Sequence, residues 1–252
     1  MKKSAVLAGS ALAANTINAK PANSLSKNLY ELKVYRLPGR SSKNLLKNYY
    51  NNAVIPFLNN RGAKVGAFDE YSMEEPPMVY IIHVHESPED YWNTIHEMKT
   101  DRTFLDAAEE YFSLPPNQPV FERYETFLLE AFNSIPDMRM PAENRNLFEL
   151  RTYESYNEDA LRRKVKMFNK EELPLFEKVG LHPVFFGEIL AGRYMPALIY
   201  MLWFKDMEER ETNWNKFRNS EEWGKMSVKE EYANTVSKVN KKFLVPADYS
   251  QI

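Results

Sequence analysis

The chain contains no cysteine, which is the plainest absence in its 252 residues. Without cysteine there are no disulfide bonds, thiolate metal sites, thiol nucleophiles or lipoprotein-type lipid attachments. Glycine is also scarce, with eight residues, and no phosphate-binding loop, dinucleotide fingerprint or nucleophile elbow occurs. Any chemistry must therefore use other side chains, and the sequence does not indicate nucleotide chemistry.

Neither sign of charge is in excess, and no long apolar run follows the first residues. The 33 basic and 35 acidic residues leave a formal net charge of −2. This balance gives no electrostatic reason to expect nucleic acid as a partner. No stretch of the mature chain approaches the ~20 apolar residues of a membrane span. With 44% hydrophobic residues, the chain is expected to be globular, with a small molecule as its partner.

The first residues have the order of a secretory signal. Lys2 and Lys3 precede a small-residue apolar stretch over residues 5–14, and small-residue sites ending at Ala13 and Ala19 follow. We predict a leader over residues 1–24 and export to the periplasm or the extracellular space. The alternative is a disordered tail, because the stretch is less hydrophobic than a strong signal.

The rest of the chain repeats itself. Residues 28–35 (NLYELKVY) match residues 146–153 (NLFELRTY) at an offset of 118 residues. The same offset, without a gap, aligns Asn51 with Asn169, Pro56 with Pro174, Gly62 with Gly180, Phe68 with Phe186 and Glu70 with Glu188. One register that preserves proline and glycine predicts a tandem duplication. We place the modules at residues 28–132 and 146–252, with a linker over residues 133–145.

Both copies predict the same order of elements. Each opens with a strand of alternating character, followed by a helix that Pro174 should kink and Gly180 should cap in the second copy. A hairpin then leads to a charged helix that we expect to bury Trp92 or Trp214 against the sheet. A last strand, at residues 120–129 in the first copy, completes the order β-α-β-β-α-β.

This order is that of the ferredoxin-like fold, an antiparallel four-stranded sheet with both helices on one face. The other face of such a sheet is bare and has to be covered. Two linked copies can cover it by packing sheet to sheet, as an α+β barrel with its helices outside. We expect the polar face of each strand to line the barrel interior.

These sequence features resemble those of the NIPSNAP family. The resemblance covers about residues 28–250, and the Glu-Leu-Arg-Thr-Tyr run at 149–153 is its most specific part. It implies the dimeric α+β barrel fold, which hosts cofactor-independent monooxygenases, haem-degrading enzymes, small isomerases and stress-response proteins. The family has no settled catalytic motif. The first copy departs from the pattern with Lys33 and Val34 where the second has arginine and threonine.

Two trios of polar residues share a face of the opening strands and are the candidate ligand-binding residues: Glu31, Lys33 and Tyr35, with Glu149, Arg151 and Tyr153. A guanidinium suits a carboxylate ligand, so these side chains could hold a polar molecule in the interior. The alternative interpretation is a buried ion-pair network that determines how the two halves dock.

His83 and His85 alternate on a strand, so both imidazoles should point the same way, ~7 Å apart. Together with Glu31 they would suit a divalent ion such as zinc or iron. They could equally supply a general base or simply pack. Our alignment gives the second copy Trp203 and Lys205 at these positions. Because no third ligand lies at a diagnostic spacing, we predict no metal site.

We predict that the barrel interior binds a small organic ligand, with cofactor-independent oxidation or isomerisation as the chemistry it could support. No cofactor is predicted, and a divalent metal or haem, with His83 or His85 on its iron, is the alternative. The alternative function is a non-enzymatic interaction protein with a structural polar interior, because no acid, base and nucleophile can be assigned by spacing. The assembly is expected to be a monomer or a homodimer.

Overall fold

A computed structural model describes residues 27–72 and 74–252, so the expected leader lies outside the described residues. The first half comprises β1 (Leu29–Arg36), α1 (Ser42–Tyr49), η1 (Tyr50–Val54), α2 (Ile55–Asn59), β2 (Val65–Glu70), β3 (Met78–His85), α3 (Pro88–Glu97), α4 (Arg102–Ala107), α5 (Glu109–Phe112) and β4 (Arg123–Ala131). The second half comprises β5 (Leu147–Glu154), α6 (Glu158–Met167), η2 (Phe168–Glu172), α7 (Leu173–Val179), β6 (His182–Ala191), β7 (Ala197–Phe204), α8 (Met207–Arg218), α9 (Glu221–Ser227), η3 (Glu230–Tyr232) and β8 (Lys238–Pro246). No described helix is long and apolar enough to cross a membrane.

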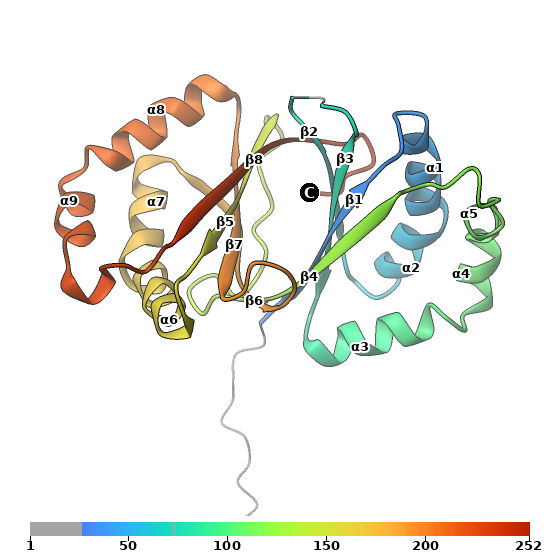
Figure 1. Ribbon diagram of the computed structural model, residues 1–252, viewed down its shortest axis with the longest axis horizontal. Helices are drawn as coiled ribbons and strands as arrows, with labels where there is room; N and C mark the ends of the chain where they lie inside the picture. The colour runs from blue at the N-terminus through green and yellow to red at the C-terminus, as the bar shows by residue number, and fades with distance from the viewer. Residues whose placement is uncertain (1–26, 73) are drawn as a thin grey trace, which may run out of the picture.

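The strands form one closed antiparallel barrel in the order β1-β3-β2-β8-β5-β7-β6-β4. Within it, each half contributes four neighbouring strands in the ferredoxin-like order, β4-β1-β3-β2 and β8-β5-β7-β6. The halves join through the pairs β2–β8 and β4–β6, and their helices lie on opposite outer sides (Figure 1). The predicted α+β fold of two ferredoxin-like modules packed as a barrel is therefore confirmed.

The first helical segment of each half is interrupted at the same place. A π-helical turn, η1 or η2, widens the helix just before Pro56 or Pro174, which sits in the first turn of the helical segment that follows. Proline lacks the N–H that an α-helix interior needs, so the helix restarts there. Gly180 then ends the second copy's helix at φ 81°, a left-handed conformation that glycine adopts without a steric cost. Both predictions are confirmed.

In the second strand of the hairpin, the structural correspondence between the two copies differs by one residue from our sequence alignment. The N–H of Leu37 donates to the carbonyl of Pro77 at 3.0 Å, and the N–H of Ser155 donates to that of Pro196 at 2.9 Å. Pro196 therefore corresponds to Pro77. The sequence alignment that pairs His83 with Trp203 instead places Pro196 at Pro76. Since strand side chains alternate, a slip of one residue exchanges their faces.

This slip changes the residues that correspond to the histidines. On β1 Glu31 lies opposite His83, and its counterpart Glu149 lies opposite a leucine on β7. The residues that take the places of the two histidines are Leu202 and Phe204, instead of Trp203 and Lys205. The histidines therefore have no polar counterpart in the second half.

Contrary to our prediction, the polar strand faces do not line the barrel interior. Tyr35 and Tyr153 pack in the two clusters beneath the helices, whereas Leu32 and Leu150 belong to the interior cluster. Alternation determines which side chains share a face, but not which face meets the helices. The interior of an eight-stranded barrel is narrow and walled by strands, so apolar side chains fill it. Beneath the helices, polar side chains find partners on the helices themselves.

The C-terminal segment ties the halves together. After β8, the chain returns to the first half, where the N–H of Ala247 donates to Ala67 and that of Gln251 donates to Val65, both at 2.9 Å. Ile252 ends the chain fully buried in the interior cluster. The second half thus closes one end of the first.

Candidate functional site

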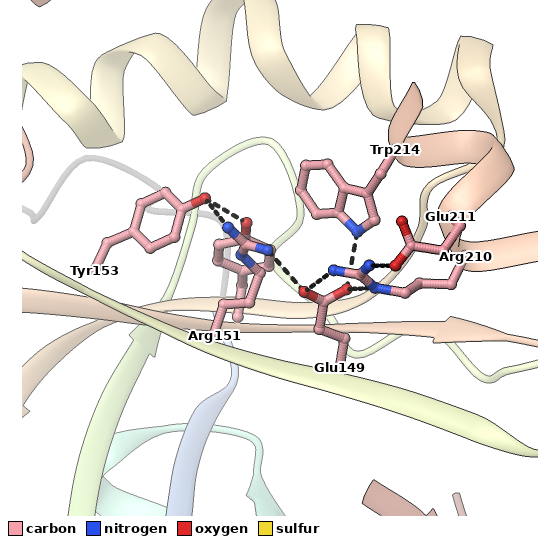
Figure 2. Close-up of polar contacts among 7 residues, drawn as sticks. Glu149, Arg151, Tyr153, Arg210, Glu211 and Trp214 are labelled. Carbon is pink, nitrogen blue, oxygen red and sulfur yellow. Dashed lines mark hydrogen bonds and ion pairs between the residues drawn. The ribbon is translucent and has the colours of Figure 1, made fainter. Parts of the chain in front are cut away.

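The predicted trio of the second half forms one hydrogen-bonded network beneath α8. Glu149 is fully buried on β5 and accepts bonds from Arg151 at 2.7 Å, from the Trp214 indole at 2.8 Å, and from two nitrogens of Arg210 at 2.9 and 3.0 Å (Figure 2). Burial opposes ionisation, but the bonds from Arg210 and the charge of Arg151 hold the pKa of Glu149 below its ordinary value. The carboxylate has no capacity left for a ligand.

The other members of this network also bond one another. Arg151 donates to the Tyr153 hydroxyl at 3.0 Å and lies 4.6 Å from the ring centre of Trp214. Tyr200 donates to the same Tyr153 hydroxyl at 2.9 Å. The buried ion-pair interpretation therefore describes this trio better than a ligand grip. It does not dock the two halves, however, because all of its members belong to the second half.

The first half lacks this network, and one tryptophan moves to the surface. Trp92 is 60% exposed, whereas Trp214, its counterpart in our sequence alignment, is 5% exposed. The prediction that both tryptophans are buried is thus correct only for Trp214. Counted from the helix N-caps Ser87 and Asp206, Trp92 is the fifth residue and Trp214 the eighth, so Trp92 lies one turn nearer the start of its helix.

The first half holds a second polar cluster at the same level of its sheet. Glu31 is 5% exposed and lies 2.8 Å from Nδ1 of His83 and 3.3 Å from the ammonium group of Lys33. His85 directs its Nδ1 to Asp90 at 3.3 Å. Tyr35 is separate from these groups. Its hydroxyl forms a hydrogen bond of 3.0 Å with that of Tyr50 on η1, so Tyr35 contacts the helical layer.

The charge states of this cluster follow from its burial and contacts. Burial disfavours the charged form of Glu31, but the hydrogen bond from His83 and the nearby positive charges, that of Lys33 among them, together outweigh it and lower the pKa of Glu31 to about 2. Burial lowers the pKa of His83 to about 4. Near neutral pH the carboxylate is therefore ionised and the imidazole neutral, so Nδ1 of His83 carries the proton and Nε2 carries a lone pair.

The barrel interior opens at one end into a cavity of about 600 Å³. None of the eight predicted site residues lines it. Its walls are apolar side chains of the alternate strand faces, among them Leu32, Val34, Met78, Phe127, Leu150 and Ile199. Its rim is basic, with Arg36, Arg123, Arg193, Lys241 and Lys242, and carries one acid, Glu125.

Three of the five basic side chains at the rim have a carboxylate partner. Arg36 pairs with Glu122 at 2.8 Å, Lys242 pairs with Glu70 at 2.7 Å, and Arg193 pairs with Glu125. Arg123 and Lys241 form no ion pair with any residue that the structure describes; Arg123 donates to a backbone carbonyl. Lys241 lies opposite Arg151 and its ammonium is 5.9 Å from the Phe243 ring, so its side chain is on the helix side of β8. Arg123 is thus the rim cation that is free to meet an anion at the mouth of the cavity.

A loop between β6 and β7 forms one side of this mouth. Gly192 has φ 148°, and a side chain there would lie 2.8 Å from the Phe127 ring. Tyr194 has φ 71°, a left-handed conformation that is uncommon for tyrosine, and its ring stacks on Phe127 at 6.2 Å between centroids. The loop therefore holds an aromatic ring and Arg193 over the cavity.

Sequence reasoning missed this rim because its residues come from three strands and a loop. One signal was present: residues 238–242 read Lys-Val-Asn-Lys-Lys, an unusually basic strand. A basic strand is weakly informative until its neighbours in the sheet are known. Arg123 and Lys242 are far apart in the sequence and line one cavity only when the barrel closes.

These features define a class of protein: two ferredoxin-like modules in one chain, closed as an α+β barrel of the dimeric type. Solved structures share this fold. A candidate monooxygenase from Lactobacillus acidophilus NCFM has a TM-score of 0.58 and 12% identity, over 87% of this chain and 94% of that one. A candidate monooxygenase from Fusobacterium nucleatum has a TM-score of 0.55 and 10% identity, over 91% of this chain and 100% of that one. Identities this low show the fold alone.

The family is found in the second half. Residues 148–251 match the family model of NIPSNAP, and the resemblance noted in the sequence is confirmed there. A NIPSNAP-like domain protein from Burkholderia xenovorans is 18% identical over 42% of this chain and 89% of that one, with a TM-score of 0.38. None of the curated protein sequences compared matches the chain significantly.

Proposed function

We propose that the protein binds a small amphipathic organic anion in the barrel cavity. The observation that carries this proposal is the combination of an apolar wall with a basic rim in which Arg123 lacks a carboxylate partner. The cavity of about 600 Å³ has the size of ordinary ligand sites, which span roughly 300–1,000 Å³.

The two parts of the cavity serve different parts of such a ligand. The apolar walls remove hydrocarbon from water, which contributes about 25 cal/mol per Å² of buried apolar surface. Arg123 is exposed at the rim, where a carboxylate, sulfate or phosphate head can keep part of its hydration. An anionic head with an apolar body fits this division better than a neutral or cationic ligand.

Binding is proposed ahead of catalysis because the wall offers little acid–base chemistry. Tyr80 is the titratable wall residue, and its hydroxyl donates to Glu70 at 3.1 Å. Burial and the Glu70 charge raise the pKa of Tyr80 well above its ordinary value, so the phenol is a hydrogen-bond donor and a poor base. Cofactor-independent oxidation or isomerisation is therefore the second candidate, to be tested by product analysis with any ligand that binds.

The test compares ligands that differ only in their head group. Decanoate, decanol and decyltrimethylammonium are titrated into the full chain by calorimetry. We expect decanoate to bind about tenfold more tightly than decanol and the cation to bind weakest. The variant Arg123→Gln should weaken decanoate binding to the level of decanol and leave decanol binding unchanged.

Two further variants serve as controls. Arg102→Gln removes an exposed cation that is far from the cavity and should change nothing. Ile199→Trp fills the cavity and should abolish binding of all three ligands while the fold, followed by circular dichroism, is retained. Equal affinities for acid and alcohol would refute the anion, and binding unaffected by Ile199→Trp would refute the cavity and favour the interaction-protein alternative.

A further inference from the structure

The polar cluster of the first half lies outside the barrel cavity and has unsatisfied capacity. His83 and His85 are 3% and 1% exposed, and Nε2 of each is buried without a hydrogen-bond partner. Buried imidazole nitrogens normally have a partner, because an unpaired buried polar atom costs about 1–3 kcal/mol. Two such atoms on one strand face indicate a shared missing partner.

The other nitrogen of each ring shows what kind of partner is missing. Nδ1 of His83 faces Glu31 and Nδ1 of His85 faces Asp90, and a carboxylate can only accept, so both Nδ1 atoms are donors. In the neutral ring Nε2 then presents a lone pair. For His85, the Asp90 carboxylate on Nδ1 with a lone pair on Nε2 is the arrangement that metal-ligating histidines adopt.

We propose that Glu31, His83 and His85 bind a divalent transition-metal ion of the zinc and iron(II) class. One potential ligand atom from each residue lies within 4.8 Å of the other two. Two ligands on one zinc ion lie about 3.4 Å apart, as bond lengths near 2.1 Å require. The ligand atoms must therefore move together by up to about 1.4 Å, and Glu31 must exchange its bond to Nδ1 of His83 for a bond to the ion. Two imidazoles and one carboxylate leave a coordination position open.

Lys33 is the group that opposes a cation here. Its ammonium lies 3.3 Å from Glu31, and the side chain is 20% exposed. A bound ion would take over the compensation of the Glu31 charge, and Lys33 would turn toward solvent. Lysine thus occupies the cluster in competition with metal, and its removal should strengthen metal binding.

The second half supplies an internal comparison. Its carboxylate, Glu149, already accepts four bonds, and the histidine positions hold Leu202 and Phe204, both fully buried. An identical fold with the ligands replaced by apolar groups cannot bind the ion. We therefore expect one metal ion for each chain, in the first half.

The test uses Co²⁺ as the probe, because its visible absorption reports nitrogen and oxygen coordination. Untagged mature protein is treated with chelator, dialysed and titrated, and its metal content is measured by mass spectrometry. We expect one Co²⁺ per chain, displaced by Zn²⁺. His83→Gln and His85→Gln should each weaken binding by about tenfold or more, as loss of a ligand does.

Two controls keep the outcome decisive. His96→Gln removes an exposed histidine and should bind Co²⁺ as the unaltered chain does. Lys33→Met retains all three ligands and should bind Co²⁺ about threefold or more tightly, so the proposal stays testable even if the histidine variants fail to fold. Absence of a Co²⁺ spectrum in both the unaltered chain and Lys33→Met would overturn the proposal, as would binding that only His96→Gln weakens.

Discussion

At the scale of single residues, equivalent positions in the two halves have different partners and therefore different roles. The charge of Glu149 is balanced by two arginines, and that of Glu31 by Lys33, with a hydrogen bond from neutral His83. The opening strands differ at Lys33 and Arg151, and the rest of the difference arises on other elements, from Arg210 on α8 and His83 on β3. The polar face common to both strands has become a structural network in one half and a histidine cluster in the other.

Glu149→Gln should destabilise the protein by about 3 kcal/mol at pH 7, because it leaves Arg151 and Arg210 buried without a compensating charge. The pKa of Glu149 is held below its ordinary 4.5 in the folded chain, so its contribution is present above pH 4.5 and is lost as the pH falls below it. Urea unfolding at pH 7 and pH 3.5 should thus show a smaller loss of stability on acidification in the variant. Glu109→Gln, an exposed matched change, should resemble the unaltered chain; equal pH dependence in all three would contradict the assignment.

At the scale of elements, the predictions that depend on local sequence signals are confirmed, and those that assign strand faces to the barrel interior are wrong. Pro174 and Gly180 act through the backbone of their own helix, so a single sequence predicts their effects. The face that a strand turns to the helices depends on which apolar set the barrel interior accepts, and the histidine register depends on a one-residue difference before β3. Neither is a local property.

Two glycines on helices should respond oppositely to alanine. Gly180 has φ 81°, and a side chain there would lie 2.9 Å from Asn213, so Gly180→Ala should cost about 1–2 kcal/mol. Gly224 lies within α9 with open space around it, and Gly224→Ala should stabilise by about 0.5–1 kcal/mol. Thermal unfolding of the two variants measures both effects, and a shift in the same direction for the two would refute this account of the helix end.

At the scale of the whole molecule, the barrel has two seams and one tail that hold the halves together. The pairs β2–β8 and β4–β6 leave no open edge in the described barrel, and the buried end of the chain covers β2. Closure also creates the cavity, because its walls and basic rim belong to both halves. Binding in the cavity should therefore depend on the seams as much as on any lining residue.

Removal of residues 247–252 should loosen the β2–β8 seam. The amides of Val65 and Ala67 lose their acceptors on Gln251 and Ser250, each 3.0 Å away, and the interior loses Ile252. We expect a loss of about 2–4 kcal/mol and faster hydrogen exchange in β2 than in β6. Hydrogen exchange of the full and the shortened chain, measured by mass spectrometry, distinguishes the strands. Equal acceleration in β2 and β6 would argue against a local role for the tail.

The sequence by itself determined the repeat, the order of elements in each half, the helix breaks and the fold class, because these follow from periodicity, proline and glycine over short spans. Only the tertiary structure decided which strand faces point inward, which residues meet at the cavity rim, and which residues of the second half replace the histidines. Leu32 and Leu150 line one cavity although they belong to different halves, and the pairing of Glu31 with His83 depends on the β1–β3 register. Such contacts depend on the closure of the barrel, and no stretch of sequence contains that information.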